Sequence, residues 1–237
     1  MTNESVSLKL IELFLLKNSV PKIFSQKNKQ KDLIKTIYNI NKLPKKEIKQ
    51  FQDFQPLLDF WYYTKLLGYE DKYKPNETLI KQFVLKEKIN KIEDPGIAIY
   101  MYVYIRILIE CNNEKYKYLK KYFNYLESII TKDYLAYGYY LTHIIFYNTK
   151  FGKIKSNSIS SIDTLIRLSN FCKNKLKFER KEIDLIGEIV LCCNLLNKTD
   201  FPYYSKMISL IKQVNDYSNL HEQTVLKVVL YQQDNLN

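Results

Sequence analysis

Two histidines, His143 and His221, are the only side chains of this chain whose ordinary pKa lies near neutral pH. Three tyrosines stand within one helical turn of His143: Tyr139, Tyr140 and Tyr147. Their hydroxyl groups can hydrogen-bond to an imidazole and orient it. This pattern predicts that His143 is a general acid or base, or orients a ligand. The alternative is a core histidine whose ring bonds a tyrosine hydroxyl.

A second polar group consists of Asp184 and Glu188, which are four residues apart and therefore share one face of a helix. Glu188 interrupts a largely apolar run, where a buried carboxylate is costly unless it is paired or needed. Gly187 beside it costs a helix about 1 kcal/mol relative to alanine, which indicates close approach by a ligand or another helix. We expect Glu188 to act with His143; the alternative is a structural pairing with a lysine.

Three further positions are candidates for the site: Arg106 and Trp61 for binding, and His221 for catalysis. Arg106 is four residues before Glu110, a spacing that favours an intrahelical ion pair and would also suit an anion clamp. Trp61 is the only tryptophan and is expected in the core or in a pocket wall. His221 begins the last helical segment, where it could close a cavity against the residues above.

Cofactor motifs are absent. The sequence has no CxxC, HxxxH or HxxE spacing, no glycine-rich phosphate loop, no GxSxG and no DDxxD run. A site made of two histidines and Glu188 is conceivable, but without supporting spacing we expect no metal and no cofactor. Four cysteines are expected to be buried and reduced, which predicts a cytoplasmic location: Cys111, Cys172, Cys192 and Cys193.

The formal net charge of +12 would suit a nucleic-acid partner, yet only three of the 37 basic residues are arginine. Because arginine is the preferred reader of phosphate and guanine, its scarcity argues against nucleic-acid binding. The first fifty residues carry eleven lysines against four acids, which indicates a solvated helical face or a weak phosphate-facing surface. No apolar run reaches the roughly 18 residues that span a bilayer, so we expect no membrane partner and no signal peptide.

The elements that position these residues are expected to be helices, because glycine (5) and proline (6) are scarce and the apolar residues recur at helical spacing. Asp94 followed by Pro95 predicts a helix start, and so does Asn76. Thr199 or Asp200 is expected to cap a helix that contains Pro202. The periodicity predicts about eleven helices, near residues 5–18, 30–42, 50–68, 76–90, 96–112, 114–130, 132–150, 158–177, 180–197, 202–215 and 221–233.

Helices of two kinds alternate along the chain. Aromatic, sparingly charged segments (59–68, 98–111, 134–148 and 184–196) are separated by lysine-rich amphipathic ones such as 78–89 and 114–130. A helix that is apolar nearly all round is buried, and an amphipathic neighbour covers it. The pattern predicts helical hairpins repeated as an α/α toroid or an α-solenoid with a tyrosine-rich central cavity. We expect one all-helical domain over 1–237, with lysine-rich helices at 1–50 and the repeat core at 51–237.

Three segments resemble an uncharacterised bacterial all-helical family that is common in actinobacterial genomes. Residues 141–152 (LTHIIFYNTKFG) are similar to its Thr-His-x-x-Phe-Tyr-x-Thr-Asp-Phe-Gly helix, with Lys150 in place of the aspartate. Residues 184–191 resemble its Asp-Leu-Leu-x-Glu-Leu helix, and 220–226 its Tyr-His-x-Thr-x-Val segment, with Leu220 in place of the tyrosine. The resemblance spans about 55–233. It implies a toroid-like helical domain in which the matching polar residues converge: His143, Glu188 and His221.

Two functions from different classes fit these observations. The first is a cavity-containing protein that binds or modifies a small molecule or a peptide, with His143 and Glu188 in the pocket and the tyrosines against an apolar or cationic ligand. The second is a helical-repeat scaffold without enzymatic activity that binds a partner protein. The sequence does not decide whether a bond is made or broken.

Overall fold

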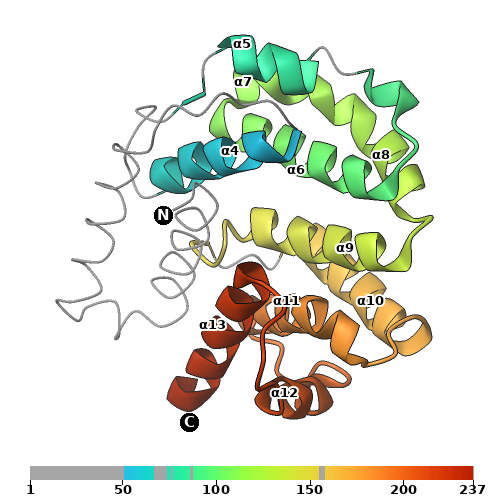
Figure 1. Ribbon diagram of the computed structural model, residues 1–237, viewed down its shortest axis with the longest axis vertical. Coiled ribbons are helices and arrows are strands. Elements are labelled where there is room, and N and C mark those ends of the chain that lie inside the picture. Colours follow the sequence, from blue (N-terminus) through green and yellow to red (C-terminus); the bar gives the residue numbers. More distant parts are fainter. Residues whose placement is uncertain (1–50, 67–73, 76, 86–87, 155–157, 237) are drawn as a thin grey trace, which may run out of the picture. The chain divides into compact units, whose positions relative to one another are not determined.

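The computed structural model describes residues 51–66, 74–75, 77–85, 88–154 and 158–236, and within these ranges every regular element is a helix (Figure 1). The all-helical class is therefore confirmed for the described chain. The helices expected at 5–18 and 30–42, the helix end at Gly68 and the cap at Asn76 lie outside these residues. The chain divides into two compact units, whose described parts fall within residues 51–137 and 138–236.

The first unit is built around α6 (Pro95–Cys111), which packs against α4 (Phe51–Leu66) and α8 (Phe123–Ile130). The side chain of Asp94 accepts a hydrogen bond from the backbone N–H of Ile97, and Pro95 occupies the first helical turn, as the sequence predicts. Ten residues of α6 are buried, so this helix forms the core of the unit, in keeping with its apolar sequence.

Two helices expected to be continuous are broken. The segment near 76–90 forms α5 (Glu77–Ile80), a π-helical turn η1 (Lys81–Leu85) and a 3-10 turn η2 (Ile89–Lys91). The segment near 114–130 forms α7 (Asn113–Tyr116), a 3-10 helix η3 (Lys117–Tyr122) and then α8. Leu119 is the one buried residue of η3, so little tertiary packing holds that stretch in a regular α-helix.

The second unit is organised around α11 (Ile183–Leu195), which follows the 3-10 turn η4 (Arg180–Glu182) and packs against α12 (Tyr204–Lys212) and α13 (Leu220–Leu236) (Figure 1). Ten residues of α11 are buried, and Asp184 is the exception in its first three turns. The unit also contains α10 (Ile159–Asn174) and most of α9 (Tyr134–Asn148), which begins before the boundary between the units.

Two glycines allow α9 and α13 to approach α11 closely. A Cβ atom on Gly187 would lie 2.7 Å from Val225 Cγ1 and from Leu226 Cδ2, and one on Gly138 would lie 2.5 Å from Leu185 Cδ2. The close approach predicted at Gly187 is therefore made by helix α13. These contacts bring the polar residues of three helices within reach of one another.

The start of α12 was expected at the wrong residue. Neither Thr199 nor Asp200 caps the helix, and Pro202 lies before it; α12 begins at Tyr204, after Tyr203 in a left-handed conformation (φ 71°). The turn in which Phe201 N–H bonds the Lys198 carbonyl takes up the preceding residues. All four cysteines are buried and none forms a disulfide. None of the described helices is long and apolar enough to cross a membrane.

Candidate acid-base site

Five polar side chains from three helices of the second unit come together. They are Tyr139 and His143 on α9, Asp184 and Glu188 on α11, and His221 on α13. Each pair on α9 and on α11 is spaced four residues apart, so each pair occupies one helix face. The sequence predicted all five as candidates, and the contacts between the helices decide how they meet.

Asp184 fixes the ring of His221. The Nδ1 atom of His221 lies 3.0 Å from Asp184 Oδ1 and 3.1 Å from Oδ2, and the Tyr139 hydroxyl donates to Oδ2 at 2.8 Å. Burial alone would raise the pKa of Asp184, but the hydrogen bond and charge of His221, with the Tyr139 hydroxyl, bring it below its ordinary value. The ionised carboxylate holds the Nδ1–H of His221, so the lone pair of the neutral ring is on Nε2.

Glu188 is the most buried member of the group, with 3% of its side chain exposed. Its Oε2 accepts a 2.5 Å hydrogen bond from Thr142 Oγ1, and its Oε1 lies 3.6 Å from His221 Nε2. Burial raises the pKa of Glu188 to about 7, against the opposing charge of His221 and the hydrogen bond from Thr142. Glu188 therefore exchanges a proton near neutral pH, which few carboxylates do.

His143 is held neutral. Its Nδ1–H donates to the backbone carbonyl of Tyr139 at 2.7 Å, and Nδ1 lies 3.8 Å from Glu188 Oε2. The ring lies beside the rings of Phe146 and Tyr147, with centroids 5.9 and 6.3 Å away. Burial among these groups lowers the pKa of His143 to about 4.

The four ionisable groups differ in their access to solvent. Exposure of the side chain is 41% for His221, 22% for His143 and 17% for Asp184, against 3% for Glu188. A molecule arriving from solvent therefore meets His221 first and Glu188 last. An imidazole oriented by a carboxylate, with a second carboxylate near its other nitrogen, can accept a proton and stabilise the resulting charge.

The two other predicted tyrosines of the second unit are buried, and the ring of Tyr147 lies beside that of His143. Tyr140 and Tyr147 are 4% and 3% exposed; Arg167 lies over the Tyr140 ring at 6.0 Å, and the Tyr147 ring meets Phe151 edge-on at 5.7 Å. Both tyrosines pack in the apolar interior of the second unit. Their predicted contact with a ligand stays a prediction.

Arg106 and Trp61 belong to the first unit. Arg106 pairs with Glu110 at 3.4 Å on the same helix, which is the ion pair that the spacing favoured over an anion clamp. Trp61 is 1% exposed, with the Lys74 ammonium 5.8 Å from its ring centroid, so it is a core residue of that unit.

Sequence reasoning missed one buried ion pair beside the site. Glu222, next to His221, is 2% exposed and accepts hydrogen bonds of 3.0 and 2.6 Å from the Arg180 guanidinium and of 2.6 Å from Ser218 Oγ. Asn219 Oδ1 accepts the backbone N–H of Glu222 at 2.8 Å. The Asn-x-x-Glu spacing is a helix-start pattern and could have indicated that this glutamate is structural.

Within the described residues, no group of three or more His, Cys, Asp or Glu side chains is arranged to hold a metal ion. A search of the curated proteins and a search of the solved structures found no match. Residues 134–220 match the model of a family described as a domain of unknown function, DUF6895. The matched segment begins at the first residue of α9 and ends one residue before His221, so it contains all of the candidate site except that histidine.

Proposed function

We propose that the second unit is an acid-base centre that binds and modifies a small molecule or a peptide, with His221 exchanging the proton. One observation carries the proposal: Asp184 holds Nδ1 of a half-exposed His221 at 3.0 Å while Nε2 lies 3.6 Å from Glu188. The sequence favoured His143 for this role. His221 suits it better because a carboxylate orients its ring, whereas His143 is bonded to its own helix backbone.

The proposed proton path uses the difference between the two carboxylates. His221 Nε2 accepts a proton from the substrate, and the ionised Asp184 stabilises the imidazolium that forms. Glu188, with a pKa of about 7, takes up or returns the proton. The 3.6 Å separation exceeds a hydrogen bond and closes on binding or through one bridging water. This chemistry needs no cofactor.

We further propose the finer architecture and location that the sequence predicts. Helical hairpins repeat as a toroid or solenoid around a tyrosine-lined cavity, supported by the contrast between α11, buried in its first three turns, and the amphipathic α12 beside it. A cytoplasmic location is supported by four buried cysteines that form no disulfide.

The test is turnover by the purified full-length chain. The protein is incubated with mixtures of small metabolites and short peptides, and products are detected by mass spectrometry. We expect a product with the wild type and a loss of about 10²–10⁴-fold in its rate with His221→Ala, the usual contribution of a general acid or base. Lys227→Ala, an exposed position on the same helix, is the matched control and should keep the wild-type rate.

Two outcomes would overturn this function. One is a wild-type protein that yields no product in any mixture; the other is a His221→Ala variant that retains the wild-type rate. Asp184→Asn separates orientation from proton exchange: it should lower the rate and also change which nitrogen of His221 carries the proton, as read by long-range nitrogen NMR.

A partner-binding scaffold is the second candidate, and α10 favours it. Ile159, Ile162 and Ile166 follow one another at helical spacing and are 80%, 48% and 57% exposed. Contiguous exposed apolar residues mark interaction surfaces. If this is the function, a protein recovered with the wild type should be lost with Ile162→Lys and kept with Asp163→Lys, an exposed neighbour outside the apolar row.

A further inference from the structure

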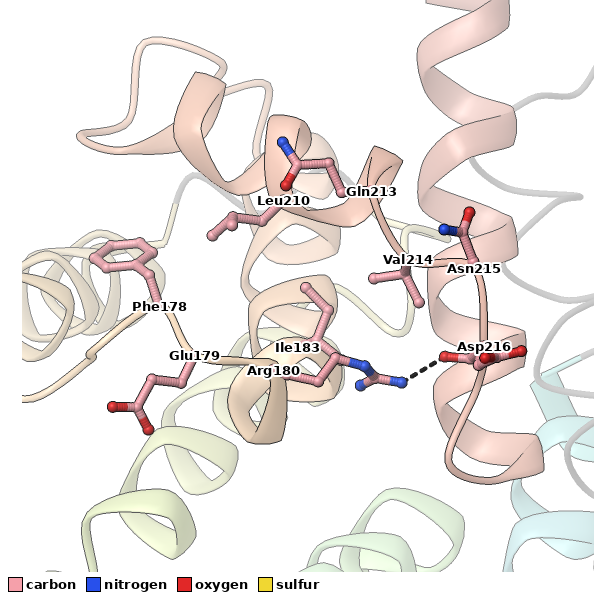
Figure 2. Close-up of a pocket in the computed structure, with 9 residues that line it drawn as sticks. All are labelled: Phe178, Glu179, Arg180, Ile183, Leu210, Gln213, Val214, Asn215 and Asp216. Atoms are coloured by element: carbon pink, nitrogen blue, oxygen red, sulfur yellow. Dashed lines mark hydrogen bonds between the residues drawn. The ribbon is translucent and has the colours of Figure 1, made fainter.

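A pocket of about 370 Å³ lies in the second unit, where the connection between α10 and α11 meets the end of α12 and the connection that follows it (Figure 2). Its volume is within the range of small-molecule sites. Four of its lining side chains are apolar, and they surround one space: Phe178, Ile183, Leu210 and Val214. Glu179, at the edge, points away from that space (Figure 2).

The polar edge of the pocket holds the paired Arg180 and the exposed Asp216. Arg180 directs its guanidinium at the backbone carbonyl of Asp216, at 2.5 Å (Figure 2). The same guanidinium bonds the buried carboxylate of Glu222. Glu222 offsets the arginine charge and occupies its hydrogen-bonding fork. Because four of the lining side chains are apolar and burying a charge against them is costly, the pocket suits a neutral apolar group better than an anion or a cation.

Phe178, which forms one wall of the pocket, has an unfavourable backbone conformation. Phe178 has a φ of 62°, and the ring of Tyr203, with a φ of 71°, lies 5.4 Å from its ring. The Lys206 ammonium covers the Phe178 ring at 3.8 Å from its centroid. A bulky residue in the left-handed region costs on the order of 1–3 kcal/mol, so these contacts stabilise an otherwise unfavourable position of the ring.

The pocket and the acid-base site share their backbone. Ile183 lines the pocket, and Asp184 of the acid-base site follows it in the chain. Arg180 also lines the pocket and bonds Glu222, which follows His221 in the chain. Consecutive Cα atoms are about 3.8 Å apart, so the pocket and the acid-base site are built on the same segments at the starts of α11 and α13. The Arg180–Glu222 pair fixes the start of α13 that carries His221.

We propose that this pocket binds a neutral aromatic or branched aliphatic group of about one ring in size. The group belongs to a small molecule or to a side chain of a peptide. That such binding serves a reaction rests on the proposed function, whereas the binding itself does not. The apolar walls bury the group, and the polar remainder of the molecule stays outside the pocket.

Fluorine NMR on the full-length chain tests the proposal with four probes. The neutral ones are 4-fluorobenzyl alcohol and N-acetyl-4-fluorophenylalanine amide; the charged ones are 4-fluorobenzoate and 4-fluorobenzylamine. We expect each neutral probe that fits to bind about tenfold more tightly than the charged ones. Binding of the amide alone identifies a peptide side chain as the natural group, and binding of both neutral probes identifies the ring itself.

Filling variants localise the binding. Leu210→Trp and Val214→Phe place bulk in the pocket and should weaken the neutral probes by about tenfold or more. Lys227→Trp adds the same indole to an exposed position of α13 outside the pocket and should leave binding unchanged. The proposal is overturned if neither neutral probe binds, if charged probes bind equally well, or if both folded filling variants bind like the wild type. His221→Ala should abolish the proposed chemistry yet keep probe binding. Failure of the proposed function can therefore be distinguished from failure of the pocket proposal.

Discussion

The Nδ1 atom of His143 lies 3.8 Å from Glu188 Oε2, and burial favours the uncharged form of both residues. The pKa of His143 falls from 6.5 to about 4, while the pKa of Glu188 rises from 4.5 to about 7. Between pH 4.5 and 6.5 the folded chain therefore holds a proton on Glu188 that the unfolded chain has lost. In the same pH range the unfolded chain holds a proton on His143 that the folded chain lacks.

These opposed shifts predict opposite effects of two substitutions on the pH dependence of stability. Glu188 makes stability fall as pH rises from about 4.5 to 7, and His143 makes it fall as pH drops from about 6.5 to 4. Relative to wild type, Glu188→Gln should gain stability with rising pH, and His143→Gln should lose it. Each slope is at most about 1.4 kcal/mol per pH unit. Urea denaturation at several pH values measures both.

An exposed carboxylate supplies the control for these curves. Glu114→Gln on α7 should leave the dependence parallel to wild type. The opposed titration would be refuted by one result. The change in unfolding free energy relative to wild type, plotted against pH, would have slopes of the same sign for Glu188→Gln and His143→Gln, or no slope.

Thr142 is expected to tune the proton affinity of Glu188. The threonine is fully buried, and its hydroxyl donates to Glu188 Oε2 at 2.5 Å, which lowers the pKa of that carboxyl. Thr142→Val should therefore raise the pKa of Glu188 further and cost about 1–3 kcal/mol of stability at pH 8. The cost should shrink at pH 5, where Glu188 is protonated.

Thr149 is the matched control, because it is also fully buried and its hydroxyl, like that of Thr142, bonds a backbone carbonyl of α9. The Thr149 hydroxyl donates to the Ile145 carbonyl and contacts no carboxylate in the described residues. Thr149→Val should change stability equally at both pH values. A carboxyl-carbon NMR titration that shows the same Glu188 midpoint in Thr142→Val and wild type would contradict the proposed role.

The helical class and the candidate residues on each helix could be predicted because they depend on local spacing. Tyr139 with His143, and Asp184 with Glu188, share faces by helical geometry alone. The pairing across helices could not be predicted. Arg180 and Glu222 are 42 residues apart, and nothing in the sequence around either one selects the other.

Helix boundaries were predicted well where a side chain caps the helix and poorly elsewhere. Asp94 bonds the Ile97 N–H as expected, so the start of α6 is right. Before α12, Tyr203 takes a left-handed conformation that propensity disfavours and that packing against Phe178 stabilises. Such tertiary effects override local preference, and they also shape the pocket.

Gly187 is expected to resist any side chain. In Gly187→Ala the new Cβ would approach Val225 Cγ1 and Leu226 Cδ2 to 2.7 Å, so these side chains or the helix α13 that carries them must shift. The cost of overpacking, about 1–3 kcal/mol, exceeds the helix-propensity gain of about 1 kcal/mol, and thermal melting should show a net loss. The shift should also weaken the hydrogen bond between Asp184 and His221, visible in the His221 ring NMR signals.

Relieving the crowding tests this cause. Val225→Ala combined with Gly187→Ala should be less destabilising than the sum of the single changes, because the valine methyl no longer meets the new Cβ. Strict additivity would show that the glycine is needed for another reason.

Arg180 is expected to stabilise the start of α13 through the buried carboxylate of Glu222. Burial alone would raise the pKa of Glu222, but hydrogen bonds from Arg180 and Ser218 hold it below its ordinary value. Arg180→Ala should cost about 1–3 kcal/mol at neutral pH, because two charge-assisted bonds to a buried acceptor are lost. The cost should diminish as pH falls through the carboxyl range, since a lowered pKa stabilises only the ionised form.

The neighbouring lysine is the control for a basic side chain on the surface. Lys181 pairs with Glu179 at 3.0 Å, and both side chains are at least half exposed. Lys181→Ala should leave the unfolding midpoint unchanged within error. Equal losses for the two variants would show that the Glu222 pairing adds nothing beyond an ordinary surface charge.

The burial of every native thiol has a practical consequence for labelling. Burial raises the pKa of Cys172 to about 12 and the pKa values of Cys192 and Cys193 well above their ordinary range, and Cys111 is 4% exposed. Thiolates react with maleimides and thiols do not, so the folded wild-type chain should remain unmodified. A single cysteine introduced on the outside of α10 would then accept a spin label or a fluorophore without removal of any natural cysteine.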